Sequence, residues 1–152
     1  MLKDSYNLLY NKKNLYNYDI KLYLNYIDNL IKIAELKKGS TILDCGCGQG
    51  FFSYLLCICG MRVFGIDFSE KGIRSAKKNY ESLGINFLVG DVLNLPFIYK
   101  FDCIFIRSCS LYNIENIKTD TSVTDKILEY IKKEGMIIFI YNTKFKKNKN
   151  SN

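Results

Sequence analysis

Ten residues, 41–50, organise the rest of this chain: Thr41-Ile42-Leu43-Asp44-Cys45-Gly46-Cys47-Gly48-Gln49-Gly50. A short apolar run ends in an acid, three alternating glycines follow it, and a second apolar run occupies residues 51–59. Glycine adopts backbone angles closed to other residues and lets a ligand approach the main chain. A glycine loop between a strand and the N-terminus of a helix offers free N–H groups to an anionic group of a ligand. The stretch therefore predicts a strand, a ligand-binding loop and a helix.

Short apolar runs and amphipathic stretches alternate along the whole chain. The runs predict strands at 41–44, 62–67, 85–89, 101–106 and 136–141. Apolar residues at three- and four-residue steps predict a helix from Ile20 to near Gly39, with further helices at 49–59, 70–83 and 123–134, the last ended by Gly135. Ser69 is the predicted N-cap of the third helix, and Ile20, Leu83 and Ile131 belong to the predicted inward-facing stripes. Such alternation is typical of an α/β three-layer sandwich, a mostly parallel sheet of about five strands with helices on both faces.

Length and charge limit the classes of function. The chain has 152 residues, 48% of them hydrophobic, which is enough for one compact domain with a core. Its 22 basic and 15 acidic residues give a net charge of +7, but four of the lysines lie in the acid-free stretch 144–152. The remaining excess of +3 is scattered over the body of the chain, whereas nucleic-acid binding needs a clustered basic footprint. Composition therefore argues against a nucleic-acid-binding protein.

The first residues lack a basic region followed by an apolar core, and no apolar stretch approaches the ~20 residues that span a bilayer. We therefore expect a cytoplasmic protein with no membrane contact. In that compartment the six cysteines are expected to be reduced thiols: Cys45, Cys47, Cys57, Cys59, Cys103 and Cys109. The two Cys-x-Cys pairs are spaced more closely than usual zinc ligands, so we expect no metal site and interpret most of the cysteines as small core residues.

Charged residues stand at the carboxyl ends of the predicted strands: Asp44 before the glycine loop, then Asp67, Asp91 and Arg107. In an open parallel sheet, ligands bind outside these ends, near the point where the strand order reverses. Asp67 lies about 20 residues beyond the loop, where an acid commonly holds a ribose diol. The alternative for Asp67 is a turn or helix-capping residue, since aspartate is common there.

At these positions the chain resembles the class I S-adenosylmethionine-dependent methyltransferases. The stretch 43–50 is similar to the first motif of that family, and Asp67 resembles its ribose-binding acid at the end of the second strand. Gly90-Asp91-Val92 resembles the segment that reads the adenine edge. The stretches 101–106 and 131–138 are similar to the fourth motif and to the helix and turn before strand five. The resemblance covers residues 40–141, with its motifs in the family's order.

The resemblance implies a Rossmann-like sheet of strand order 3-2-1-4-5 and S-adenosylmethionine as cofactor. The loop and Asp44 would hold the methionine part of the cofactor, Asp67 the ribose, and Asp91 with Val92 the adenine beside Phe68. Arg107 would contact the methionyl end of the cofactor, although its charge could equally serve an acidic substrate. The cofactor-binding residues so implied are Asp44, Gly46, Cys47, Gly48, Gly50, Asp67, Phe68, Asp91, Val92 and Arg107.

The resemblance also implies a domain plan. We expect an N-terminal helical or lid segment at 1–39, an S-adenosylmethionine-binding methyltransferase domain at 40–143 and a disordered basic tail at 144–152. Members of the family continue beyond strand five through a helix and two further strands, which this chain lacks. Strand five would then be an apolar edge, and such edges pair with other chains. Three alternatives follow for that edge: the natural protein is truncated here, the edge pairs in a homodimer, or the N-terminal segment covers it.

The nearest competing class is a nicotinamide-dependent oxidoreductase, which also carries glycines after its first strand. Its fingerprint is G-x-G-x-x-G. In this chain Phe51 stands where the third glycine of that fingerprint would follow Gly46 and Gly48. The missing glycine favours the methyltransferase.

The function predicted from the sequence is methyl transfer from S-adenosylmethionine to a small-molecule acceptor. The alternative is a catalytically inactive cofactor-binding or regulatory module that acts through a partner chain. The chain contains no histidine, so a histidine general base is excluded, and no catalytic residue is assigned. Four tyrosines are candidates for the wall of an acceptor pocket or for packing: Tyr10, Tyr16, Tyr18 and Tyr112.

Overall fold

The computed structural model describes residues 18–96, 98–109 and 122–140. Within them, five strands form one sheet in the order β3-β2-β1-β4-β5, and all neighbouring strands are parallel. The strands are β1 (Thr41–Cys45), β2 (Arg62–Asp67), β3 (Asn86–Val89), β4 (Phe101–Arg107) and β5 (Ile131–Ile140). The predicted fold class and strand order are therefore confirmed.

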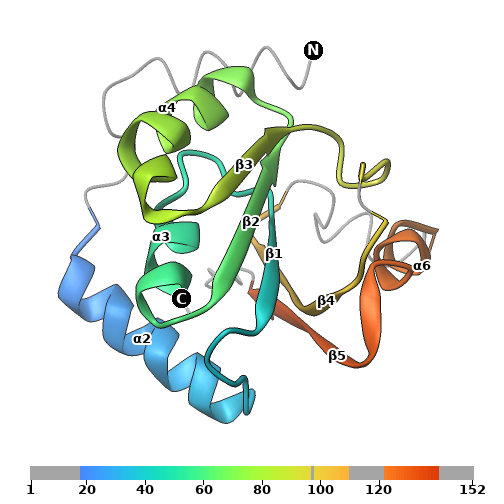
Figure 1. Ribbon diagram of the computed structural model, residues 1–152, viewed down its shortest axis with the longest axis horizontal. Coiled ribbons are helices and arrows are strands. Elements are labelled where there is room, and N and C mark those ends of the chain that lie inside the picture. Colours follow the sequence, from blue (N-terminus) through green and yellow to red (C-terminus); the bar gives the residue numbers. More distant parts are fainter. Residues whose placement is uncertain (1–17, 97, 110–121, 141–152) are drawn as a thin grey trace, which may run out of the picture.

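Helices cover both faces of this sheet (Figure 1). The helices of the described residues are α2 (Ile20–Ile33), α3 (Phe51–Ile58), α4 (Glu70–Tyr80) and α6 (Ser122–Leu128), and a short 3-10 helix, η1 (Glu81–Leu83), continues α4. Of these, α2, α3 and α4 lie on one side of the sheet, and α6 lies on the other side, next to β4 and β5. The strand order reverses at β1: β2 and β3 follow on one side of it, and β4 and β5 follow on the other side.

The core has two parts because side chains alternate across each strand. Ile42 and Phe105 belong to the cluster that contains buried residues of α2, α3 and α4. Their neighbours Leu43 and Ile104 belong to the second cluster, which includes Ile127 of α6. Burial on both faces explains why the strands are nearly continuous apolar runs rather than alternating ones.

Helix ends follow local capping chemistry. The Asp19 carboxylate accepts from the Leu22 amide at 3.1 Å and caps α2, and the Ser69 hydroxyl accepts from the Gly72 amide at 3.2 Å and caps α4, as predicted. The predicted end of the first helix near Gly39 is wrong, because α2 ends at Ile33 and Gly39 lies with φ +85° in the turn before β1.

Two side chains predicted to face inward are exposed. Ile20 at the start of α2 is 51% exposed, and Leu83 in η1 is 47% exposed. Leu83 turns outward because η1 winds at three residues per turn, which rotates it away from the buried stripe of α4.

The last strand is longer than the sequence predicts. Ile131 does not belong to the preceding helix, which ends at Leu128, but pairs with Phe101 as the first residue of β5. Gly135 does not end a helix but lies within the strand, at a register shift between Phe101 and Cys103. A Cβ at Gly135 would lie 2.7 Å from Ile131 Cγ1 and 3.0 Å from the Asp102 carbonyl, so the irregular strand needs glycine there. Pairing with β4 therefore overrides the helical spacing.

Several predictions concern residues outside the described ranges: the segment 1–17, the tail 144–152, Tyr141, and the tyrosines Tyr10, Tyr16 and Tyr112. The domain boundaries at 39/40 and 143/144 stay predictions. Across the described part of the chain, no helix combines the length and apolarity needed to cross a membrane.

Candidate functional site

The glycine loop after β1 is folded tightly against the end of β2. Gly46, Gly48 and Gly50 all have positive φ, at 75°, 53° and 81°. The amides of Gly46 and Cys47 both donate to the Ile66 carbonyl, at 2.8 and 3.1 Å. A Cβ at Gly50 would lie 2.9 Å from both the Ala76 Cβ and the Phe87 ring. Glycine there lets the loop and the start of α3 approach α4 and β3.

Asp67 is hydrogen-bonded to the glycine loop. The Gly48 amide donates to its Oδ2 at 2.9 Å, and the Ser69 amide donates to its Oδ1 at 2.8 Å. The side chain is 5% exposed, and burial raises its pKa despite these two donors. A carboxylate offers about four lone-pair sites, so about two remain for further donors. This residual acceptor capacity fits a ribose diol.

Asp44 is the second buried acid of the site, at 2% exposure. The Ser53 hydroxyl donates to its Oδ2 at 2.5 Å. Burial raises the pKa of Asp44 to about 7, against the lowering effect of Ser53; the nearby Asp67 also raises it, and Arg107 lowers it. A carboxylate desolvated in this way gains from a cation, so the pair of acids fits a cationic ligand.

Cys47 contributes to the loop through its backbone. Cys47 is a half-buried free cysteine, and its Sγ would lie 2.9 Å from a Cβ at Gly65. Burial raises the pKa of this thiol well above its ordinary value, and the nearby Asp44 and Asp67 act in the same direction. The thiol is therefore a packed, neutral group.

The end of β3 is tied to the same corner of the sheet, because the Gly90 amide donates to the Asp67 carbonyl at 3.0 Å. The exposed Asp91 carboxylate accepts from the Leu93 amide at 2.9 Å and from the Asn94 side chain at 3.1 Å, and so shapes the following turn. Val92 is buried in the second core cluster, and Phe68 is half-buried after Asp67. Their adenine-binding roles stay predictions.

Arg107, at the end of β4, is held by aromatic rings. Its guanidinium carbon lies 4.1 Å from the centre of the Phe52 ring and 5.8 Å from that of Tyr18, and its Nη1 lies 3.5 Å from the Tyr18 hydroxyl. Tyr18 also stacks on Phe51, with ring centres 4.5 Å apart. Among the described residues no carboxylate lies within ion-pair distance of Arg107. Arg107 is a candidate to bind an anionic group of a ligand.

Two residues next to the site were not singled out from the sequence. Ser53 is fully buried beneath Asp44, and the Cys109 Sγ would lie 3.2 Å from a Cβ at Gly46. A signal existed for Ser53, a hydroxyl on the buried side of an apolar helix, where burial without a partner is costly. No local pattern connects Cys109 with Gly46.

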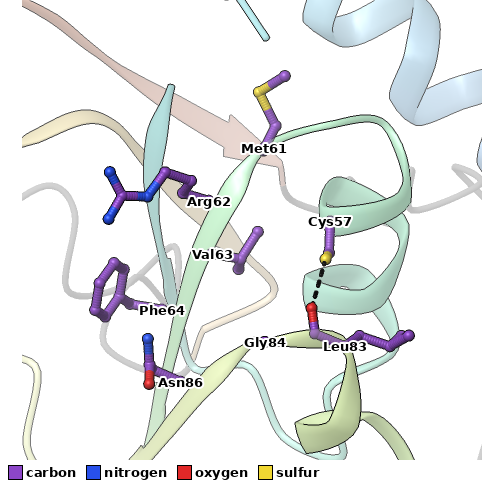
Figure 2. Close-up of a pocket in the computed structure, with 8 residues that line it drawn as sticks. All are labelled: Cys57, Met61, Arg62, Val63, Phe64, Leu83, Gly84 and Asn86. Atoms are coloured by element: carbon purple, nitrogen blue, oxygen red, sulfur yellow. Dashed lines mark hydrogen bonds between the residues drawn. The ribbon is translucent and has the colours of Figure 1, made fainter. Parts of the chain in front are cut away.

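A separate hollow of about 210 Å³ lies at the other end of the sheet, near the starts of β2 and β3. Figure 2 shows Arg62, Phe64 and Asn86 on one side of β2 and Cys57 with Leu83 on the other. None of the predicted cofactor-binding residues lines this hollow.

Comparison with known proteins agrees with this geometry. A family model described as a methyltransferase domain matches residues 36–151. The ubiquinone biosynthesis O-methyltransferase of Pelagibacter ubique is 31% identical over 137 residues, which cover 84% of this chain and 55% of that protein. A probable cobalt-precorrin-6B C(15)-methyltransferase (decarboxylating) of Saccharolobus solfataricus is 38% identical over 113 residues, covering 68% and 53%. The demethylmenaquinone methyltransferase of Chlamydia felis is 25% identical over 131 residues, covering 85% and 57%.

The chain thus spans about half the length of these curated relatives. Among solved structures, an S-adenosylmethionine-dependent methyltransferase from Clostridium acetobutylicum superposes with a TM-score of 0.64 at 22% identity, covering 91% of this chain and 57% of that one. A methyltransferase from Thiobacillus denitrificans, solved with S-adenosyl-L-homocysteine, gives 0.60 at 21% identity, covering 76% and 46%. With its family match and its sheet order, the chain belongs to the methyltransferase domain family and has the fold of class I S-adenosylmethionine-dependent methyltransferases.

Proposed function

We propose that this chain binds S-adenosylmethionine at the carboxyl ends of β1 to β4 and transfers its methyl group to a small-molecule acceptor. The observation that carries the proposal is the hydrogen bond from the Gly48 amide to the Asp67 carboxylate, which joins a glycine loop to a buried acid. The cofactor supplies a methyl group made electrophilic by its sulfonium. The protein binds it, aligns it and excludes water.

Each part of the cofactor has a candidate partner. Asp67, with acceptor capacity left on both oxygens, takes the ribose. The loop and Asp44 take the methionine part, and the segment after β3 takes the adenine. The residues in these roles are Asp44, Gly46, Cys47, Gly48 and Gly50 for methionine, Asp67 for ribose, and Phe68, Asp91 and Val92 for adenine.

Charge supports this orientation. Asp44 and Asp67 are two buried acids whose pKa values burial raises, so a bound cation stabilises their ionised forms. S-adenosylmethionine carries a sulfonium and an ammonium group. Its carboxylate matches Arg107, whose guanidinium lies on the Phe52 ring near Asp44.

Aromatic side chains lie beside Arg107, on the side proposed for the acceptor. The half-buried rings of Tyr18, Tyr23 and Phe51 pack together beside Arg107 and offer an apolar wall. The names of the relatives from Pelagibacter and Chlamydia refer to quinone compounds, which supports a small organic acceptor for this chain. If Arg107 does not hold the cofactor, its charge suits an acidic acceptor.

Turnover tests the proposal directly. The protein is incubated with S-adenosylmethionine and a panel of small acceptors, including quinols and phenols, and release of S-adenosylhomocysteine is measured. Formation that depends on an acceptor supports methyl transfer. Calorimetric binding of S-adenosylhomocysteine without turnover on any acceptor supports the alternative, a cofactor-binding module that acts through a partner. Absence of both binding and turnover contradicts the proposal.

A homodimer through β5 is also proposed. β5 stands at the end of the described sheet and hydrogen-bonds to β4. Exposed strand edges pair with other chains. Sedimentation equilibrium should give twice the mass of 17.7 kDa, and a monomer at all concentrations contradicts the dimer.

A further inference from the structure

Ser53 occupies an unusual position for a polar residue. It is the third residue of α3, it is fully buried, and its helix neighbours Phe52, Leu55 and Leu56 are buried apolar residues. A buried hydroxyl without a partner costs free energy. Its partner is the Oδ2 of Asp44, 2.5 Å from the Ser53 Oγ. The hydroxyl therefore acts on one group, the carboxylate at the start of the glycine loop.

Asp44 faces charged or titratable groups from each element around it. β2 contributes Asp67, β4 contributes Arg107, and the thiols of Cys45 and Cys47 lie on its own strand and loop. Burial and Asp67 oppose its ionisation, whereas the Ser53 hydroxyl, Arg107 and the backbone amide of Ser53 favour it. Both thiols are neutral, because burial raises their pKa values. Ser53 is the uncharged donor of this set.

We propose that Ser53 is a positioning residue of the cofactor site, whose hydroxyl holds the Asp44 carboxyl group beside the glycine loop and favours the ionised form that accepts from the ammonium group of the cofactor. The inference rests on the proposed function. It adds a residue outside the glycine motif that controls how cofactor affinity depends on pH.

The pH dependence follows from the balance around Asp44. With a pKa of about 7, the carboxylate is largely protonated below neutrality, and the cofactor must then displace a proton to bind. Affinity therefore rises with pH up to about 7 and levels off above it. Removing the hydroxyl raises the pKa of Asp44 further, since a hydrogen bond to the ionised form is lost. The affinity curve then moves to higher pH.

The size of the effect can be stated. Loss of a hydrogen bond to a charged group corresponds to a pKa shift of about one unit. For that shift the ionised fraction at pH 7 falls from about one half to about one tenth, so affinity falls about fivefold. At pH 8.5 the same shift changes affinity only about 1.3-fold.

The experiment measures S-adenosylhomocysteine binding by calorimetry from pH 6 to 8.5 for the wild type, Ser53→Ala, Ser53→Cys and Ser53→Thr. Ser53→Thr keeps the hydroxyl, so its affinity curve should follow that of the wild type. Ser53→Cys has a weaker donor, so its curve should lie between those of the wild type and Ser53→Ala. The matched control is Thr41→Val, which removes a hydroxyl from the Asp102 carboxylate, 2.7 Å away at the opposite end of the sheet. That variant should lose stability without a shift of the affinity curve.

A second readout needs no cofactor. The Asp44 carboxyl carbon is titrated by NMR in the free protein, and its midpoint should rise by about one pH unit in Ser53→Ala. If Ser53→Ala does not fold, the Ser53→Cys midpoint decides. An unshifted midpoint, or a loss of affinity that is equal at every pH, overturns the role of Ser53. A wild type that binds no S-adenosylhomocysteine at any pH overturns the proposed function itself.

Discussion

The amide of Gly48 donates a hydrogen bond to the Asp67 carboxylate, 2.9 Å away, and so joins the loop after β1 to the end of β2. The same acid accepts from the Ser69 amide at the start of α4. One side chain thus fixes the relative positions of a glycine loop, a strand end and a helix N-terminus. Substitutions at Asp67 should therefore affect both the loop and any ligand that lies on it.

Asp67→Ala should weaken S-adenosylhomocysteine binding about 10- to 100-fold, the usual effect of losing hydrogen bonds to a charged group. Asp67→Asn, which keeps one acceptor oxygen, should lose less. The control is Asp125→Ala, which removes an exposed carboxylate of α6 on the other side of the sheet. Affinities are measured by calorimetry. If Asp67→Ala and Asp67→Asn bind as tightly as the wild type and the control Asp125→Ala, Asp67 does not belong to the site.

Gly50→Ala should destabilise the fold by more than backbone strain alone explains. Its φ of +81° costs about 1–2 kcal/mol for any side chain, and the new Cβ would also meet Ala76 and Phe87 at 2.9 Å, which adds about 1–3 kcal/mol. Gly39→Ala is the matched control, because Gly39 has φ +85° but nothing within 4 Å of the added Cβ. Urea unfolding measures both, and equal losses would contradict a steric role for Phe87.

Asp102 should stabilise the end of the sheet that lies opposite the glycine loop, and this contribution should depend on pH. It accepts from the Thr41 amide and hydroxyl at 2.8 and 2.7 Å and from Lys132 at 2.8 Å. Partial burial alone would raise its pKa, but these donors outweigh burial and lower it to about 2.

Because the folded-state pKa of Asp102 is depressed, its contribution is present above the unfolded value of about 4 and is lost as pH falls towards 2. Asp102→Asn should therefore lower the free energy of unfolding at pH 7 by about 1–3 kcal/mol and by much less at pH 2. Chemical unfolding at both pH values checks this, and an equal loss at both would exclude the electrostatic origin.

Asp44 should give a pH dependence of the opposite sign. Its folded-state pKa of about 7 is raised, so its contribution is fully present below the unfolded value of about 4 and is lost as pH rises through 7. The free energy of unfolding should fall between pH 4 and 7, at about 1.4 kcal/mol per pH unit and by a few kcal/mol in all. Asp44→Asn should flatten this slope, and an unchanged slope would show that Asp44 is ionised in the folded protein throughout.

The prediction from sequence succeeded for features that depend on residues near one another in the chain and on the regular geometry of a parallel sheet. Apolar runs and capping residues such as Ser69 are local, and parallel strands bring their carboxyl ends to one edge, so Asp44 and Asp67 were expected to lie near each other, as they do. Their roles in cofactor binding stay predictions. It failed where a non-local contact overrides a local pattern. Ile131 follows a helical stripe but pairs with Phe101, and Gly135 resembles a helix end but lies in a strand.

The sequence by itself determined the α/β sheet, its strand order through the family resemblance, and the glycine loop with its acids, because strand polarity alone brings them together. Only the tertiary structure decided their electrostatic state. That Ser53 donates to Asp44, that burial raises the pKa of Asp44 to about 7, and that Arg107 lies on Phe52 depend on distances between separate elements and on exclusion of water. No local pattern records such distances, since each arises from packing one element against another.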